Sequence, residues 1–186
     1  GIANVTLLPA EGGVSGFDTG PANCFMDDWY RAHHADHDRT GGAQRFDAGG
    51  AWATSGTVDD RLLADLMREP WLHRQPPKST GIEHFSPAWL RERLPKNAEN
   101  RPADIQATLA EFSAASLVAN IERFVPFEPD RILLCGGGTA NADLVARIQA
   151  RLGNTPVEST AAHGIAPDFI EATLIAWLAH EFTAGR

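Results

Sequence analysis

The sequence predicts an α/β fold, and three observations carry that prediction. Short apolar runs bounded by turn residues, at 2–8 and 132–135, are typical of β-strands. The stretch 102–124 repeats its apolar residues three and four positions apart, which is typical of a helix with one buried face. At 132–152 a strand pattern, a glycine turn and a helix pattern follow one another. Because strands alternate with helices, we expect helices packed against a sheet rather than an all-β fold.

The N-terminal part predicts two strands followed by a helix. Residues 2–8 form the first expected strand, and a short second strand covers 14–17 after a glycine turn. Pro21 suits the first position of a helix, and the apolar spacing after it predicts a helix from 21 to about 35. Asp18 is therefore expected at a strand-to-helix turn.

The middle of the chain combines a loop with short helices. Residues 39–56 are rich in glycine and predict a loop with Trp52 as its anchor. Thr57 resembles an N-cap for a helix that ends near 68. The Ser86–Pro87 pair then opens a further short helix, because serine caps helices and proline suits their first turn.

The C-terminal half predicts a long helix and then a strand–turn–helix unit. Residues 102–124 form a helix buried on a broad face, and 132–135 form a short strand of the fully buried kind. The glycine turn leads into an amphipathic helix that ends at 152. A short strand at 157–158 and a last helix at 167–182 complete the pattern.

Composition narrows the class of protein. With 186 residues and 43% apolar content, the chain can bury a sizeable core, while a net charge of −8 argues against a nucleic-acid-binding surface. No apolar run approaches membrane-spanning length, and the start lacks the features of a secretory signal, so we expect a cytoplasmic protein. Cys24 and Cys135 lie far apart, which favours two reduced thiols. The sequence starts with Gly1 instead of an initiator Met, and it starts inside an expected strand. We therefore expect this chain to be a piece of a longer protein.

The segment CGGGTANADL is the first candidate site. Gly136, Gly137 and Gly138 let the backbone approach a ligand closely, and the helix that follows offers unpaired N–H groups to a phosphate. The alternative is a tight connection that binds nothing. Asn141 is accordingly either a ligand contact or a local helix cap.

Asp18, in the segment GFDTGPAN, is the second candidate. A carboxylate at the end of a strand lies where open α/β sheets bind their ligands. The alternative is an aspartate that only hydrogen-bonds its turn or caps the next helix. The tripeptide Asp18–Thr19–Gly20 is also the signature of aspartic proteases.

Three other positions carry weaker signals. Glu171 heads an apolar stripe on the last helix, so it either lies buried with a partner or lines a pocket. The alternative is that it complements the helix dipole from the first turn. His33 and His37 share a helix face, but no further ligand completes a metal site, and a solvated helix end is favoured. Lys78 either reaches a phosphate or points to solvent.

Together the segments resemble a known family, the anhydro-N-acetylmuramic acid kinases of the sugar kinase, Hsp70 and actin superfamily. Seven motifs match in the family's order across nearly the entire chain. They are GIANVTLLP, GFDTGPAN, GGAWATSGTVDDRLLADL, PPKSTGIEHFSPAWL, ATLAEFSAASL, ILLCGGGTANADL and PDFIEATLIAWLA. Ala22, where the family usually has glycine, and Gly49, where it has an acidic residue, depart from the pattern.

The resemblance implies a domain organisation. Residues 1–186 would form the C-terminal ribonuclease-H-like domain of a two-domain kinase, a mixed sheet flanked by helices, with a loop and helical insertion at about 40–100. The family's Gly-Thr-Ser-x-Asp-Gly phosphate loop is not found in this chain, so the N-terminal domain is expected elsewhere and the chain alone should be inactive. The family also implies a homodimer, while the net charge and the lack of a membrane-length apolar run predict contact with neither nucleic acid nor membrane.

The resemblance implies an activity as well. ATP and Mg²⁺ would be used to open 1,6-anhydro-N-acetylmuramic acid with water and to phosphorylate O6, giving N-acetylmuramic acid 6-phosphate in peptidoglycan recycling. Asp18 matches the family's base, and Glu171 and Asn23 match sugar-binding positions. The adenosine-side loop matches the residues Gly136, Gly137, Gly138 and Asn141. The metal ligands are not identified.

Two alternatives stay open at this point. A retroviral-type aspartic protease half would use Asp18, although the expected helices do not suit an all-β domain. A nucleotide-binding regulatory domain would keep the glycine turn without catalysis.

Overall fold

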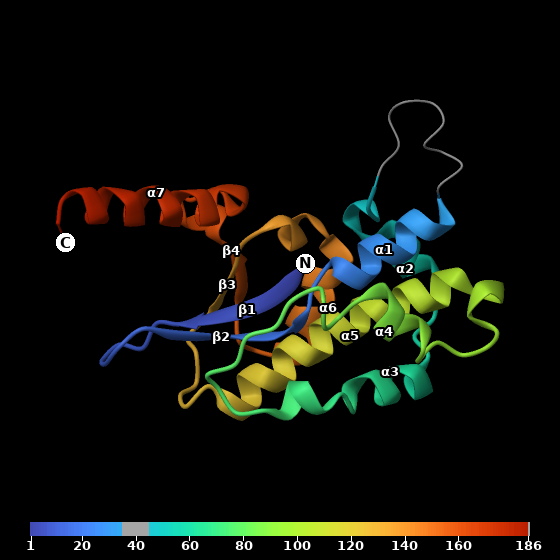
Figure 1. Ribbon diagram of the computed structural model, residues 1–186. Coiled ribbons are helices and arrows are strands. Elements are labelled where there is room, and N and C mark those ends of the chain that lie inside the picture. Colours follow the sequence, from blue (N-terminus) through green and yellow to red (C-terminus); the bar gives the residue numbers. More distant parts are fainter. Residues whose placement is uncertain (35–44, 186) are drawn as a thin grey trace.

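The computed structural model describes residues 1–34 and 45–185. Helices and short strands alternate along the chain (Figure 1). The elements are β1 Ile2–Leu7, β2 Ser15–Pro21, α1 Cys24–His33, α2 Ala51–Ser55, α3 Asp60–Met67, α4 Pro87–Arg91, α5 Pro102–Phe124, β3 Ile132–Leu134, α6 Ala142–Leu152, β4 Val157–Ser159 and α7 Ile170–Thr183. The α/β class predicted from the sequence is confirmed.

The first sheet is the β1–β2 hairpin, and it corrects the predicted end of the second strand. The strands pair antiparallel from Ile2 opposite Pro21, with Asp18 opposite Asn4. The second strand therefore does not end at 17, and Pro21 closes it instead of opening a helix. A proline fits there because the end of a strand tolerates a missing N–H group. Helix α1 begins only at Cys24.

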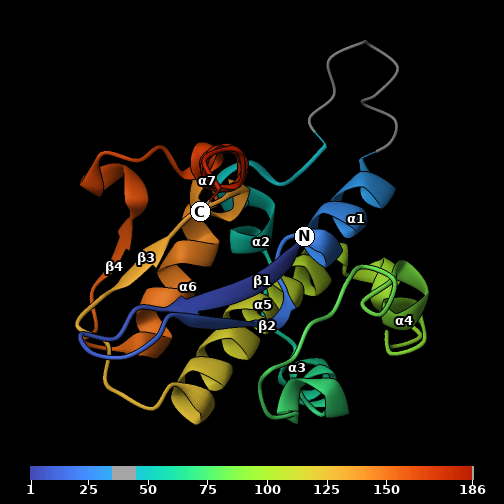
Figure 2. The ribbon, with the colours of Figure 1, turned by 60° about the vertical axis from the view of Figure 1, so that its left-hand side comes forward.

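The second sheet consists of β3 and β4, which pair parallel. One mixed sheet was expected, but the described strands form two separate two-stranded sheets (Figure 2). The expectation that β3 is fully buried is also wrong, since Leu133 is 40% exposed. Successive side chains of a strand point to opposite faces of the sheet. Because α6 packs against this strand pair on one face, only every second side chain is covered.

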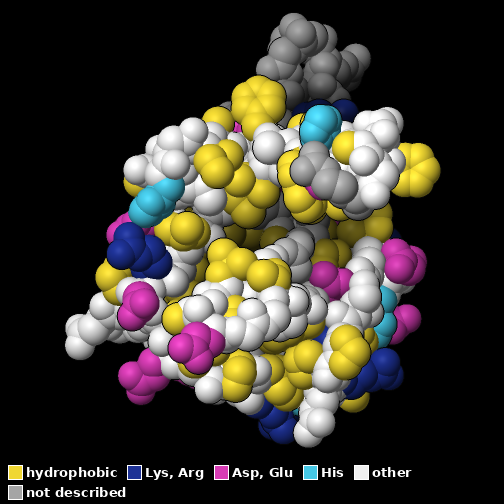
Figure 3. All heavy atoms as spheres, turned by 90° about the vertical axis from the view of Figure 1, so that its left-hand side faces the viewer, with side chains coloured by type: hydrophobic (Ala, Val, Ile, Leu, Met, Phe, Trp, Pro, Cys, Tyr) yellow, Lys and Arg dark blue, Asp and Glu magenta, His cyan; other side chains and the backbone are white. Residues whose placement is uncertain are grey.

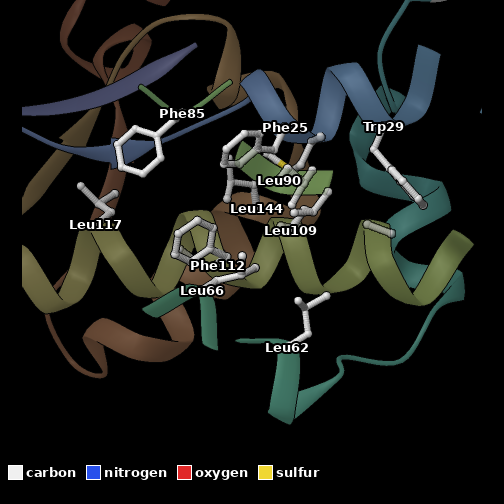
Figure 4. Close-up of a cluster of buried hydrophobic side chains, with 14 of the residues drawn as sticks. Phe25, Trp29, Leu62, Leu66, Phe85, Leu90, Leu109, Phe112, Leu117 and Leu144 are labelled. Carbon is white, nitrogen blue, oxygen red and sulfur yellow. The ribbon is translucent and has the colours of Figure 1, made fainter. Parts of the chain in front are cut away.

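Helix α5 forms the centre of the core, as its pattern predicts. It contacts the hairpin and helices α1, α2, α3 and α6. Ile105, Leu109 and Phe112 are fully buried, and Figure 4 shows Leu109 and Phe112 pointing into a cluster with Phe25 from α1. Burial of such side chains contributes about 1.5–3 kcal/mol each, so α5 is the support on which the other elements rest.

The segment before α3 is more helical than predicted. Residues 48–55 are helical instead of loop, because the Asp47 carboxylate accepts hydrogen bonds from the N–H groups of Trp52 and Ala53, both at 2.9 Å. Such a carboxylate satisfies donors that a helix start leaves unpaired. Trp52 does anchor the segment, with its ring against Tyr30. Residues 39–44 of the predicted loop lie outside the described residues.

The cap of α3 is also corrected. Asp59, not Thr57, accepts from the N–H groups of Arg61 and Leu62, each at 3.0 Å. Thr57 instead donates its N–H to Asp104 of α5 at 2.8 Å. Ser86 caps α4 as predicted. The predicted helices α5, α6 and α7 are also confirmed.

A buried carboxylate, Glu69, joins the segments around α4. It is 8% exposed and accepts from the backbone N–H of Trp71 at 3.3 Å and from Nε1 of Trp89 at 3.0 Å. His84 and Arg93 lie at 3.3 and 3.5 Å. Burial would raise the pKa of Glu69, but the hydrogen bonds led by that of Trp89 outweigh burial and hold the pKa below its ordinary value.

Helix α7 projects to the same side of the molecule as the tip of the β1–β2 hairpin (Figure 1). Its apolar side chains are exposed, Trp177 at 55% and Phe182 at 84%. Figure 3 views the molecule from this side, where hydrophobic side chains gather around a hollow. Among the described residues, no helix combines the length and apolar character needed to cross a membrane.

Candidate active site

Asp18 lies in β2, three residues before the strand ends, and one of its carboxylate oxygens is held by a neighbouring loop. Oδ2 accepts a hydrogen bond from the Ser79 hydroxyl at 2.9 Å and from the Thr80 N–H at 2.8 Å. The backbone N–H of Asp18 donates to the Lys78 carbonyl at 3.1 Å. The carboxylate is therefore fixed in orientation by residues about sixty positions away in the sequence, while Oδ1 receives no such bond from the described residues.

The loop that holds Asp18 is anchored by the side chain of Lys78. This lysine is 8% exposed, and its Nζ donates to the Leu72 carbonyl at 2.8 Å and to Oδ1 of Asn120 at 2.6 Å. Burial, with a smaller effect of the Arg123 charge, lowers the pKa of Lys78 to about 8. The sequence left a phosphate contact or solvent as its alternatives, and neither describes this buried position.

The glycine turn connects β3 to α6 and is exposed on one side. A Cβ at Gly136 or Gly137 would meet no described atom within 4 Å, so their backbone is open to a ligand. Gly138 is different, because a Cβ there would lie 3.3 Å from Oδ1 of Asn23. The turn is fixed at its start by the Gly136 N–H, which donates to the Pro167 carbonyl at 3.0 Å.

Asn141 acts as a cap. Its Oδ1 accepts from the N–H of Leu144 at 3.0 Å, so the helix-cap role that the sequence offered is present. A ligand contact through the amide nitrogen stays a prediction. The turn at Gly49 and Gly50 covers this helix start, since a Cβ at Gly50 would overlap Asn141 and Asp143. The N-terminus of α6 is thus less open to a phosphate than the sequence alone indicates.

Asn23 occupies the N-cap position of α1 without using its side chain as a cap. Its Oδ1 is buried and accepts no hydrogen bond from the described residues. A buried acceptor without a donor costs about 1–3 kcal/mol, which makes Asn23 a position where a bound group would complete the bonding. The amide faces Gly138, so two predicted site positions meet here.

Glu171 lies in the first turn of α7 and is exposed. This exposure contradicts a buried pair, whereas a pocket-lining carboxylate and a first-turn carboxylate both fit it. The Gly136 N–H donates to the Pro167 carbonyl just before α7, so the start of α7 lies beside the glycine turn. Burial first, and then the Glu171 charge, raises the pKa of the Cys135 thiol. Cys24 is also a free thiol, and burial raises its pKa to about 11. Both cysteines are therefore poor nucleophiles at neutral pH.

Only one member of the histidine pair, His33, lies within the described residues. His33 contacts the Trp29 carbonyl at 2.9 Å and Glu99 at 3.0 Å, and His37 lies outside the described residues. Within residues 1–34 and 45–185, no group of three or more His, Cys, Asp or Glu side chains could hold a metal ion.

Comparisons with known proteins add the decisive observation. The family model described as anhydro-N-acetylmuramic acid kinase matches residues 1–185. The chain belongs to this family. Relatives named anhydro-N-acetylmuramic acid kinase include one from Xanthomonas campestris pv. campestris, 48% identical over 186 residues, which are 100% of this chain and 47% of the relative. Another, from Chromohalobacter salexigens, is 47% identical over 191 residues, 100% of this chain and 49% of the relative.

Similarity extends to more distant members of the kinase family. The relative from Cupriavidus metallidurans is 39% identical over 188 residues, covering 98% of this chain and 47% of its own length. The chain thus spans about half the length of the curated relatives it matches. Membership of the kinase family, together with the largely helical fold, leaves the aspartic protease alternative without support.

The sequence predicts Asp18, Asn23 and the glycine turn as site positions, and the structure places the Asn23 side chain beside Gly138 of that turn. It missed the two donors to Asp18, Ser79 and Thr80, although both stand in the motif PPKSTG. It also missed Gly50, whose role depends on contact with α6. In the sequence, these residues are marked only by their position inside motifs that the family shares.

Proposed function

We propose that this chain forms part of a kinase that converts 1,6-anhydro-N-acetylmuramic acid to N-acetylmuramic acid 6-phosphate. The activity is proposed for a family-length protein, meaning one that contains this chain and has the length of its relatives. The observation that carries the proposal is the Asp18 carboxylate, oriented through Oδ2 by Ser79 and Thr80 in a chain that matches the kinase family over residues 1–185. The chain alone is expected to be inactive.

In the proposed reaction Asp18 acts as general base. Its Oδ1 takes a proton from water, the water oxygen bonds to the anomeric carbon, and the bond from that carbon to O6 breaks. O6 then bonds to the γ-phosphorus of ATP, and ADP leaves. A positioned base of this kind contributes typically about 10²- to 10⁴-fold to the rate.

ATP would bind with its adenosine side at the glycine turn. Support comes from the open backbone of Gly136 and Gly137, which no described atom approaches. Gly138 and Asn141 would belong to the same nucleotide-binding loop, and they also hold the turn in place against Asn23 and α6. Mg²⁺ would bridge the phosphates and neutralise their charge, which phosphoryl transfer requires.

The sugar would contact Asn23 and Glu171. The unpaired Oδ1 of Asn23 supplies an acceptor for a sugar hydroxyl beside the glycine turn. Glu171 stands exposed near the same turn, so its carboxylate is free to orient a substrate. From the family we further infer a cytoplasmic homodimer that acts in peptidoglycan recycling.

Product analysis tests the proposal. A family-length protein incubated with ATP, Mg²⁺ and the anhydro sugar in ¹⁸O-water should release ADP and give a 6-phosphate that carries ¹⁸O at the anomeric carbon only. The regulatory-domain alternative predicts ATP binding without sugar-dependent ADP release. That second result, or ¹⁸O in the phosphate, would overturn the proposed reaction.

A further inference from the structure

Lys78 is unusual because it is a buried cation that, among residues 1–34 and 45–185, has no carboxylate in salt-bridge contact with it. Its ammonium contacts two neutral oxygens, the Leu72 carbonyl at 2.8 Å and the Asn120 amide at 2.6 Å. The remaining surroundings are aromatic, with Nζ 4.6 Å from the ring centroid of Trp71 and 5.0 Å from that of Phe124. Burying a charge in this way is costly, so the position must serve the local structure.

The same contacts link Lys78 to the strand that carries Asp18. Asn120, 3% exposed on α5, donates through Nδ2 to the Thr19 carbonyl at 3.1 Å and to the Ser116 carbonyl at 2.8 Å. Its Oδ1 accepts from Lys78. One amide therefore holds both the residue after Asp18 and the lysine whose own carbonyl accepts from the Asp18 N–H.

The consequence falls on the two residues that follow Lys78. Ser79 and Thr80 supply the two donors to Oδ2 of Asp18, and Ser79 is itself exposed. An exposed loop would not hold two donors in place without an anchor, because each free torsion must be fixed at an entropic cost. The buried lysine provides that anchor one residue before the donors.

We infer that Lys78, together with Asn120, is a positioning residue for the reaction: it fixes the 78–80 loop so that Ser79 and Thr80 orient the Asp18 carboxylate. This inference rests on the proposed function of Asp18 as base. Lys78 touches neither Asp18's carboxylate nor, in this assignment, any substrate, and acts only through the loop. Misplacement of a reacting group by about 1 Å can cost about 10²-fold in rate.

The first arm of the test needs no activity. Amide hydrogen exchange of the chain is measured for wild type, Lys78→Met and Arg123→Met. Arg123 is the matched control, since it lies over the same Phe124 ring, at 5.5 Å, without bonding to the loop. Exchange at Asp18 and Thr80 should rise at least about tenfold in Lys78→Met only, with the α5 amides unchanged. Unchanged exchange at Asp18 and Thr80 would overturn the inference.

The second arm uses the family-length protein. Lys78→Met should lower kcat about 10- to 100-fold while the KM values for ATP and sugar stay within about twofold, and Arg123→Met should retain kcat. If Lys78→Met loosens the whole fold, so that α5 amides also exchange faster, Ser79→Ala decides. A lower kcat at unchanged KM in Ser79→Ala supports the inference, and an unchanged kcat overturns it. An inactive wild-type protein would instead refute the proposed function, while the exchange arm still decides the positioning role.

Discussion

Replacing Glu69 by glutamine should destabilise the chain by about 2–3 kcal/mol at pH 7. The carboxylate accepts from donors on both oxygens, with Trp71 N–H and His84 on Oε1 and Trp89 and Arg93 on Oε2. Glutamine keeps one acceptor oxygen and turns an NH₂ group toward the other donors. A hydrogen bond to a charged group contributes about 1.5–3 kcal/mol. Losing the hydrogen bonds to one of the two carboxylate oxygens therefore gives the stated magnitude.

The effect of Glu69→Gln should depend on pH, with a definite sign. The folded pKa of Glu69 lies below its ordinary value of 4.5. Its stabilising contribution is therefore fully present above pH 4.5 and is lost as the pH falls through the lower folded pKa. The stability difference between wild type and variant should accordingly shrink in that acidic range.

Urea denaturation at a series of pH values measures this difference. Glu92→Gln is the matched control, because Glu92 also pairs with Arg93, at 3.9 Å, but its side chain is 78% exposed. An exposed pair of this kind contributes about 0–1 kcal/mol, so the control should remain close to wild type at every pH. A Glu69→Gln effect as small as that of Glu92→Gln, or one that does not change between neutral and acidic pH, would refute the reasoning.

Two further predictions concern the glycine turn and α7. Asn141→Ala should lower the free energy of unfolding by about 1 kcal/mol through loss of the α6 cap. Asn141→Asp keeps an acceptor for the Leu144 N–H and should stay near wild type in thermal denaturation. Equal loss of stability in both variants would contradict the cap. Trp177→Phe should remove the most red-shifted and most acrylamide-quenchable part of the chain's tryptophan fluorescence. The reason is that Trp177 is 55% exposed, whereas Trp29 and Trp71 are 6% and 4% exposed. Unchanged quenching would contradict the exposure of α7.

The sequence predicted those parts of the fold that local patterns control. Helix α5 could be predicted with its full length because its apolar spacing is continuous and Pro102 marks its start. The end of β2 could not, because residues 18–21 become strand only through pairing with β1 on the other side of the hairpin turn. Helix α2 was missed for a similar reason, since its capping Asp47 stands several residues before the N–H groups it accepts from.

The same distinction applies to the candidate site. The glycine turn follows from consecutive letters in the sequence, and so does the place of Asp18 within its motif. The environment of Lys78 does not, because its acceptors come from Leu72 and from Asn120, which is 42 positions away. Contacts of that range decide whether a lysine is a surface charge or a buried anchor, and only the folded structure shows them.

The central claim is that Asp18 is the base that activates water, and one substitution tests it most directly. In a family-length protein, Asp18→Asn keeps the size of the side chain and an acceptor for Ser79 and Thr80 but removes the proton-accepting charge. Turnover measured as sugar-dependent ADP release should fall by about 10²-fold or more, while ATP binding measured by calorimetry stays nearly unchanged. Near-normal turnover of Asp18→Asn would contradict the assignment.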